Sequence, residues 1–143
     1  MPVKHRISPC LWFDGQAEEA ANFYVSIFRN SRITAVSRFG EAGPGPKGSV
    51  MVVGFELDGQ AFTALNDGPF KFTEAISMIV HCETQAEVDH YWEKLSAGGQ
   101  PGRCAWLKDK FGVSWQVVPT ALIELMQDND PAKSARVVQA MLQ

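Results

Sequence analysis

The chain has 143 residues, 20% of them charged, and a formal net charge of −3. Its length supports one domain with its own core, and the absence of a basic stripe argues against nucleic acid or an anionic membrane surface as partners. Cys10, Cys82 and Cys104 form no C-x-x-C pair, the N-terminal residues lack the apolar core of a signal peptide, and no segment is long and apolar enough to span a bilayer. We therefore expect a cytoplasmic protein that is neither exported nor membrane-spanning.

The first half of the sequence predicts one strand, one helix and three further strands. From Ala17 to Phe28, apolar residues recur at the i, i+3, i+4, i+7 spacing of an amphipathic helix. Asp58-Gly59 predicts a two-residue hairpin, because both positions tolerate a positive φ. The predicted strands are residues 7–13, 31–40, 49–57 and 60–66.

The second half begins in the same way and is shorter. Val88, Tyr91, Trp92 and Leu95 form a second helical stripe, and Gly98-Gly99 is expected to end that helix. The predicted strands are residues 75–82, 104–109 and 113–119, the last two joined by a turn around Phe111-Gly112. Two short helices follow, the second starting at Asp130-Pro131.

A weak internal repeat relates the two halves. Gln16-Ala17-Glu18 recurs as Gln85-Ala86-Glu87, and Phe23-Tyr24 recurs as Tyr91-Trp92, although so short a match can also arise by chance. We therefore predict an α+β fold of two βαβββ modules, the second abbreviated, flanking a cavity. The predicted organisation is a single domain, 1–143, with modules at 1–68 and 69–119 and C-terminal helices at 120–143.

The Gly- and Pro-rich stretch 40–48 is not a phosphate loop. Gly40 and Gly45 have the right spacing, but Pro46 stands where the lysine is needed, and proline lacks the backbone donor that would hold a phosphate. We expect a surface loop or lid there, and we expect no nucleotide cofactor.

Among the three histidines, only His81 is a candidate for chemistry. His5 and His90 are expected to be solvated, whereas His81 ends a strand and can titrate near neutral pH, so that a structural and a catalytic role both stay open. Strand alternation puts Ile76, Met78, Val80 and Cys82 on one apolar face suited to the helix, and Ser77, Ile79 and His81 on the other. The internal repeat carries this assignment to the first module, and hairpin equivalence matches Gln116 with Thr63. Together they predict one inner wall. This wall contains Ser8, Cys10, Trp12, Thr63, Ser77, His81 and Gln116, and a register slip of one residue would invert it.

The segments AEEAANFYVSIF, ALNDGPFKFTEAIS and CAWLKDKFGVSWQVVP make the chain resemble a known superfamily. It is the glyoxalase, bleomycin-resistance and dihydroxybiphenyl-dioxygenase superfamily, also called vicinal oxygen chelate. Within it the chain is most similar to the PhnB-like branch, labelled 3-demethylubiquinone-9 3-methyltransferase. The resemblance covers nearly the whole chain. It implies a cup-shaped mixed sheet with helices outside, and a homodimer.

The resemblance also implies where a divalent metal would be held in related enzymes. The matching positions here are Ser8, Thr63, Ser77 and Gln116, whose neutral side chains are poor ligands for zinc, nickel or iron(II). Cys10 with His81 offers only two replacement ligands, where a catalytic zinc usually has about three. We therefore expect no metal. We expect no S-adenosylmethionine either, because the chain has no Gly-rich strand-to-helix turn.

The expected function is metal-independent binding of a small organic molecule in the cup between the modules. Trp12 and Trp106 would supply apolar contact, Gln116, Ser77 and Thr63 would orient polar atoms, and His81 would transfer a proton if there is catalysis. The alternative is an enzyme, either an isomerase, lyase or transferase using His81 with Asp109 or Glu83, or the methyltransferase of the family label. In a third interpretation the inner polar residues are satisfied core groups and the interior is closed.

Overall fold

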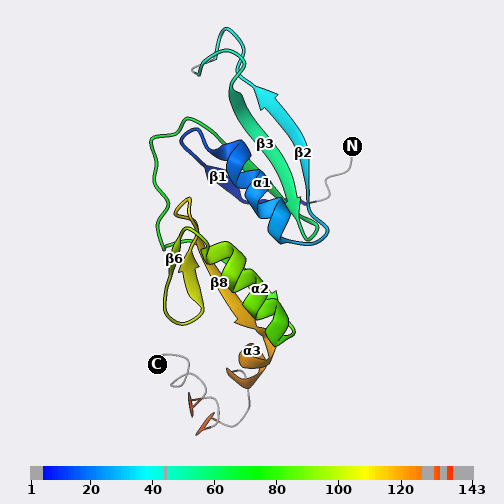
Figure 1. Cartoon of the computed structure of the whole chain (residues 1–143), viewed down its shortest axis with the longest axis vertical. Helices are drawn as coiled ribbons and strands as arrows, with labels where there is room; N and C mark the ends of the chain where they lie inside the picture. Colours follow the sequence, from blue (N-terminus) through cyan, green and yellow to red (C-terminus); the bar gives the residue numbers. More distant parts are fainter. Residues whose placement is uncertain (1–4, 44, 127–130, 133–134, 137–143) are drawn as a thin grey trace. The chain divides into compact units, whose positions relative to one another are not determined.

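The computed structural model describes residues 5–43, 45–126, 131–132 and 135–136. The chain divides into two compact units, residues 1–71 and 72–143. Each unit contains a four-stranded mixed sheet with a helix packed on it, and both follow the order βαβββ (Figure 1). The predicted α+β fold of two βαβββ modules is confirmed. In the part of the chain that the structure describes, no helix has the length and apolar character needed to cross a bilayer.

In the first unit the strands are ordered β1-β4-β3-β2. Strand β1 runs parallel to β4, and the other neighbours are antiparallel. Between β3 and β4, Asp58 and Gly59 have φ of 48° and 84°, which confirms the predicted hairpin. The elements are β1 (Cys10–Trp12), α1 (Ala17–Ile27), β2 (Arg32–Arg38), β3 (Val50–Leu57) and β4 (Gln60–Leu65).

The core of this unit lies between α1 and the sheet. Small residues on the buried face of α1, such as Ala20 and Ala21, let the helix approach β3 closely. Tyr24 stacks on Phe55 at 6.2 Å between ring centroids, and Phe55 stacks on Phe62 at 5.4 Å. Burying such a side chain contributes about 1.5–3 kcal/mol, so this aromatic row is a main source of the unit's stability.

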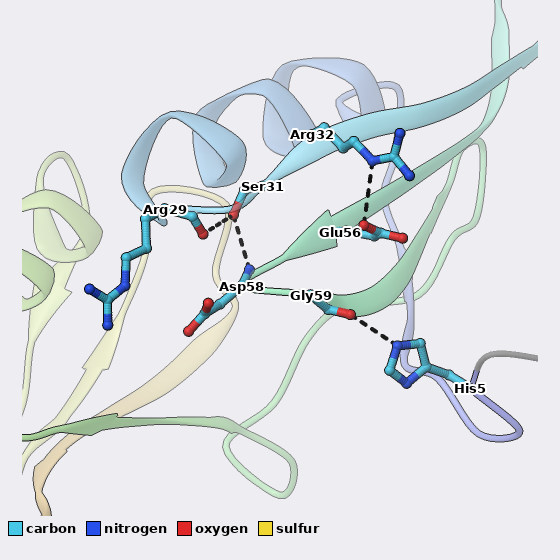
Figure 2. A network of polar contacts seen from close by, with 7 residues as sticks. All are labelled: His5, Arg29, Ser31, Arg32, Glu56, Asp58 and Gly59. Carbon is cyan, nitrogen blue, oxygen red and sulfur yellow. Dashed lines mark hydrogen bonds and ion pairs between the residues drawn. The ribbon is translucent and has the colours of Figure 1, made fainter.

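The β3–β4 turn is tied to neighbouring segments by polar contacts (Figure 2). Ser31 Oγ accepts a hydrogen bond from Asp58 N at 3.1 Å and donates to Arg29 O at 3.0 Å. His5, expected to be solvated, has Nε2 2.9 Å from Gly59 O and is partly buried. That expectation is wrong, because the imidazole ring reaches a backbone carbonyl oxygen of the turn.

In the second unit the strands are ordered β5-β8-β7-β6, the same arrangement as in the first. Strands β6 and β7 have only two and three residues, so the predicted abbreviation of this module is confirmed. The predicted last helix, starting at Asp130-Pro131, falls mostly outside the described residues. The elements are β5 (Met78–Cys82), α2 (Gln85–Ser96), β6 (Gln100–Pro101), β7 (Trp106–Lys108), β8 (Ser114–Pro119) and α3 (Thr120–Met126).

Helix α2 is capped locally and buries one face of the second sheet. Thr84 Oγ1 accepts a hydrogen bond from Glu87 N at 3.1 Å, and Glu87 Oε1 accepts one from Glu83 N at 2.9 Å. These bonds satisfy backbone donors at the helix start. The core between the helix and the sheet contains Tyr91 and Leu95 of α2 and, from the strands, Val80, Cys82, Leu107, Trp115 and Val117.

Strands β1 and β5 are shorter than predicted, because each begins three residues later. Ile7 and Ile76 were expected within strands, and they are 85% and 68% exposed. A turn at Glu74–Ile76, where Thr73 Oγ1 accepts a hydrogen bond from Ala75 N, delays β5. The apolar side chains of these segments predicted strands that begin too early. The prediction that Ile76 faces the helix is also wrong.

Candidate ligand-binding site

The predicted wall residues of the first unit lie along β1 and β4. Cys10 and Thr63 are direct partners in the parallel pairing of these strands, and Trp12 follows on the same face. Cys10 and Trp12 are exposed, whereas Leu11 between them is buried. Ser8 is exposed and lies two residues before β1, so it does not belong to the strand.

Trp12 is fixed in position by two contacts. Its Nε1 donates a hydrogen bond to Asn66 O at 3.2 Å, and its ring packs against Phe70 at 4.9 Å between centroids. Gly68 lies close by, and a Cβ there would clash with the indole ring. The indole is therefore held as a rigid apolar surface, 39% exposed.

In the second unit the structure brings three of the predicted residues together. Gln116 Nε2 donates a hydrogen bond to Ser77 Oγ at 2.9 Å. Trp106 on β7 and Ile79 on β5 are the neighbours of Gln116 on its two sides. Each of these side chains is at least partly exposed, so the sheet presents an open face with a central amide.

His81 lies further along the same face, at the carboxyl end of β5. It is exposed, and its partner in the parallel pairing is Val118. The buried Val80 and Cys82 alternate with the exposed Ile79 and His81, which is the alternation expected from the sequence.

Asp109, considered as a partner for His81, has a structural role in the β7–β8 turn. Its Oδ1 accepts hydrogen bonds from Phe111 N at 2.9 Å and Val113 N at 3.0 Å, and its Oδ2 accepts one from Trp115 Nε1 at 2.9 Å. The residue is 3% exposed, and Trp115 lies on the helix-facing side of the sheet. Asp109 is therefore not on the face that carries His81.

The pKa values of Glu74 and Cys82 are shifted from their usual values. The hydrogen bond with Lys108 holds the pKa of the exposed Glu74 carboxyl below its usual value. Burial raises the pKa of the Cys82 thiol, with a smaller contribution from the Glu87 carboxylate. Since the nucleophile is the thiolate, Cys82 is an inert core residue.

The comparisons with known proteins identify the family. The family model described as 3-demethylubiquinone-9 3-methyltransferase matches residues 5–118. The chain belongs to this family. No curated protein matched the sequence. A solved structure of a putative 3-demethylubiquinone-9 3-methyltransferase, the PhnB protein from Bacillus cereus, is 41% identical with a TM-score of 0.72 and covers 80% of this chain and 99% of its own.

Two further solved structures share the fold at lower identity. A protein from Pseudomonas aeruginosa is 23% identical with a TM-score of 0.66, over 81% of this chain and 98% of its own. The fosfomycin resistance protein FosX from Listeria monocytogenes, solved with Mn(II) and sulfate, is 14% identical with a TM-score of 0.57, over 81% of this chain and 92% of its own. The predicted membership of the PhnB-like family is confirmed, and the likeness to FosX shows that the fold is shared.

Two buried polar residues escaped the prediction from sequence. Ser114 on β8 is 2% exposed, and within the described part of the chain its Oγ has no hydrogen-bond partner. Asn66, at the end of β4, bonds to backbone groups of Ala17 and Val50. Strand alternation places Ser114 on the face of Gln116, but nothing in the sequence pattern announces its burial.

Proposed function

We propose that the chain is a metal-independent protein of the glyoxalase fold that binds a small organic molecule against the open faces of its sheets. The observation that carries this proposal is the hydrogen bond between Gln116 and Ser77. These are two of the four positions at which metal-dependent relatives are expected to hold their ion, and here a neutral amide and a neutral hydroxyl satisfy each other. The neighbouring Trp106 and Ile79 add apolar surface, as is usual in ligand sites.

The donor chemistry of the four positions does not fit a divalent transition metal. Ser8, Thr63, Ser77 and Gln116 offer hydroxyl and amide groups, whereas zinc, nickel and iron(II) favour imidazole, thiolate or carboxylate. Among the residues that the structure describes, no group of three or more His, Cys, Asp or Glu side chains is placed to hold an ion. Mn(II) belongs to the FosX structure, and the ligands to hold it at the matching positions here are missing.

Elemental analysis of protein purified without chelators tests the absence of a metal. We expect far less than one equivalent of any divalent ion, and no rise in melting temperature on addition of Zn²⁺, Ni²⁺ or Mn²⁺. An ion at about 100 times its Kd would stabilise the fold by about 2.7 kcal/mol, which such a melt detects.

A matched variant provides the positive control. Ser77→His, Ile79→His and Gln116→Glu together place two imidazoles and a carboxylate at neighbouring positions of the open face, so the triple variant should gain measurable zinc binding. A stoichiometric ion in the unaltered protein would refute metal independence.

A second candidate function is catalysis, because the family label describes a methyltransferase and His81 is exposed on the open face. Calorimetric titration with S-adenosylmethionine separates the two proposals. We expect no heat of binding at millimolar ligand, since the chain offers no Gly-rich turn for the cofactor. Saturable binding would favour methyl transfer over simple ligand binding.

The proposal includes a cytoplasmic location and a homodimer. The three cysteines are free thiols, as is usual for a reducing compartment. Dimers with two-fold symmetry are the commonest soluble homo-oligomers, and the short strands β6 and β7 leave an edge of the second sheet that a second subunit could extend.

A further inference from the structure

The second unit has a cleft of about 360 Å³ beside β6 and β7. Pro101, Gly102 and Trp106 contribute to its walls, and Lys108 and Ser114 also line it. We propose that this cleft binds a neutral molecule of one or two fused rings, with a carbonyl or hydroxyl oxygen hydrogen-bonded to Ser114 Oγ. The inference rests on the proposed function, because it names the chemical class of the ligand on the same face as Gln116.

The hydroxyl of Ser114 is the observation that points to a ligand. The side chain is 2% exposed, and Oγ lacks a hydrogen-bond partner among the residues described. Buried polar groups in folded proteins are nearly always paired, because an unmade hydrogen bond costs free energy. Ser114 lines the cleft, and strand alternation puts it on the same face as Gln116, two residues further along β8. A ligand oxygen in the cleft would satisfy this hydroxyl.

The charges lining the cleft favour a neutral ligand. Lys108 Nζ is paired with the Glu74 carboxylate, so the two charged side chains of the cleft neutralise each other. A charged ligand would have to replace one of them and would leave the other without its partner. Besides Ser114, the remaining lining residues are mostly apolar, which suits an apolar ring; they are Gln100, Pro101, Gly102, Trp106 and Leu107.

The size of the cleft limits the ligand to a small one. Ligand pockets span about 300–1,000 Å³, and this cleft is at the lower end of that range. One or two fused rings fill such a volume.

The loop that carries Trp106 has an unusual backbone that fixes the wall of the cleft. Cys104 and Ala105 are consecutive non-glycine residues with φ of 56° and 70°. Three hydrogen bonds hold them in place, from Trp106 N to Arg103 O, from Gly102 N to Trp106 O and from Val117 N to Ala105 O. A loop tied in this way keeps the indole in place before a ligand arrives, which lowers the entropic cost of binding.

NMR titration of the full chain with two probes of matched shape, one with a ketone and one without, tests the inference. The probes are 1-indanone and indane, which share one shape and differ by a single carbonyl oxygen. We expect 1-indanone to shift the indole N–H signal of Trp106 and to bind at least about fivefold more tightly than indane. In Ser114→Ala that preference should fall to about one. Indane-1-carboxylate should bind several-fold more weakly than 1-indanone, because the ion pair already neutralises the cleft.

A thermal melt separates a ligand-binding hydroxyl from a structural one. If Ser114 Oγ has no partner in the free protein, Ser114→Ala should melt at the same or a higher temperature while its binding of 1-indanone is weakened. Ser26→Ala is the matched control, since Ser26 is exposed on α1 and bonds only locally to Phe23 O. It should leave both probe affinities unchanged.

Different results would overturn this inference and the proposed function. Equal affinities for the two probes, or a preference retained in Ser114→Ala, would overturn the role of Ser114. Shifts confined to Ser77 and Gln116 would overturn the cleft and leave the proposed function intact. If a library of neutral and charged fragments shifted no signal on the open faces, both would fail.

Discussion

Replacing Asp109 by alanine is expected to destabilise the protein by about 3 kcal/mol, because two buried donors and one partly buried donor lose their acceptor at once. The carboxylate accepts hydrogen bonds from Phe111 N, Val113 N and Trp115 Nε1, all within 3.0 Å. It thereby shapes the turn and anchors the largest fully buried side chain of the chain that the structure describes. Urea denaturation followed by tryptophan fluorescence measures the loss.

Asp109→Asn separates the contribution of the two backbone hydrogen bonds from that of the bond to Trp115 Nε1. The amide oxygen can still accept from the two backbone donors, but the amide nitrogen then faces Trp115 Nε1, donor against donor. The loss should be about 1–2 kcal/mol. Asp89→Asn, an exposed carboxylate on α2, is the matched control and should change stability by less than about 0.5 kcal/mol. Alanine and asparagine variants as stable as the control would show that the carboxylate does not organise the turn.

The fold was predictable because its signals are local. Asp58-Gly59 marks a hairpin through the backbone freedom of two adjacent residues, and the structure gives both a positive φ. The stripe ending at Leu95 faces the core because the spacing of a helix puts those residues on one side. The predicted strand starts near Ile7 and Ile76 were wrong, because an apolar composition indicated a strand at positions where both side chains are exposed.

The sequence could predict which side chains of the site share a face of the sheet, but not which side chains contact one another. Alternation correctly separated Val80 from His81, since side chains alternate in any strand once the register is known. The bond between Ser77 and Gln116 joins residues 39 positions apart, and the burial of Ser114 depends on residues of other segments that line the same cleft. Such contacts follow from tertiary packing, which no local pattern reports.

Asn66 holds the first unit together in the way that Asp109 holds the turn of the second. Its Oδ1 accepts a hydrogen bond from Ala17 N at 2.9 Å, and its Nδ2 donates to Val50 O at 2.9 Å. Helix α1 needs this distant cap, because the side chain of its own N-cap residue, Gln16, makes no capping bond. Asn66 therefore joins the start of the helix to the sheet.

Replacing Asn66 by alanine is expected to cost about 3 kcal/mol, since a helix-start donor and the Val50 carbonyl both lose their partners in a buried setting. Asn66→Asp keeps the acceptor for Ala17 N but turns an oxygen toward Val50 O, so it should cost about 1–2 kcal/mol. Denaturation gives the total loss, and hydrogen exchange at the Ala17 amide locates it.

The control for this experiment is Asn22→Ala, which removes the same side chain from an exposed position on α1, where it bonds only to Glu18 O. That variant should stay within about 0.5 kcal/mol of the unaltered protein. Faster exchange at Ala17 in Asn66→Ala, with slow exchange retained in Asn22→Ala, would place the effect at the cap. If the Ala17 amide stayed protected without Asn66, the start of α1 would have to be held by its own residues, and the long-range cap would be refuted.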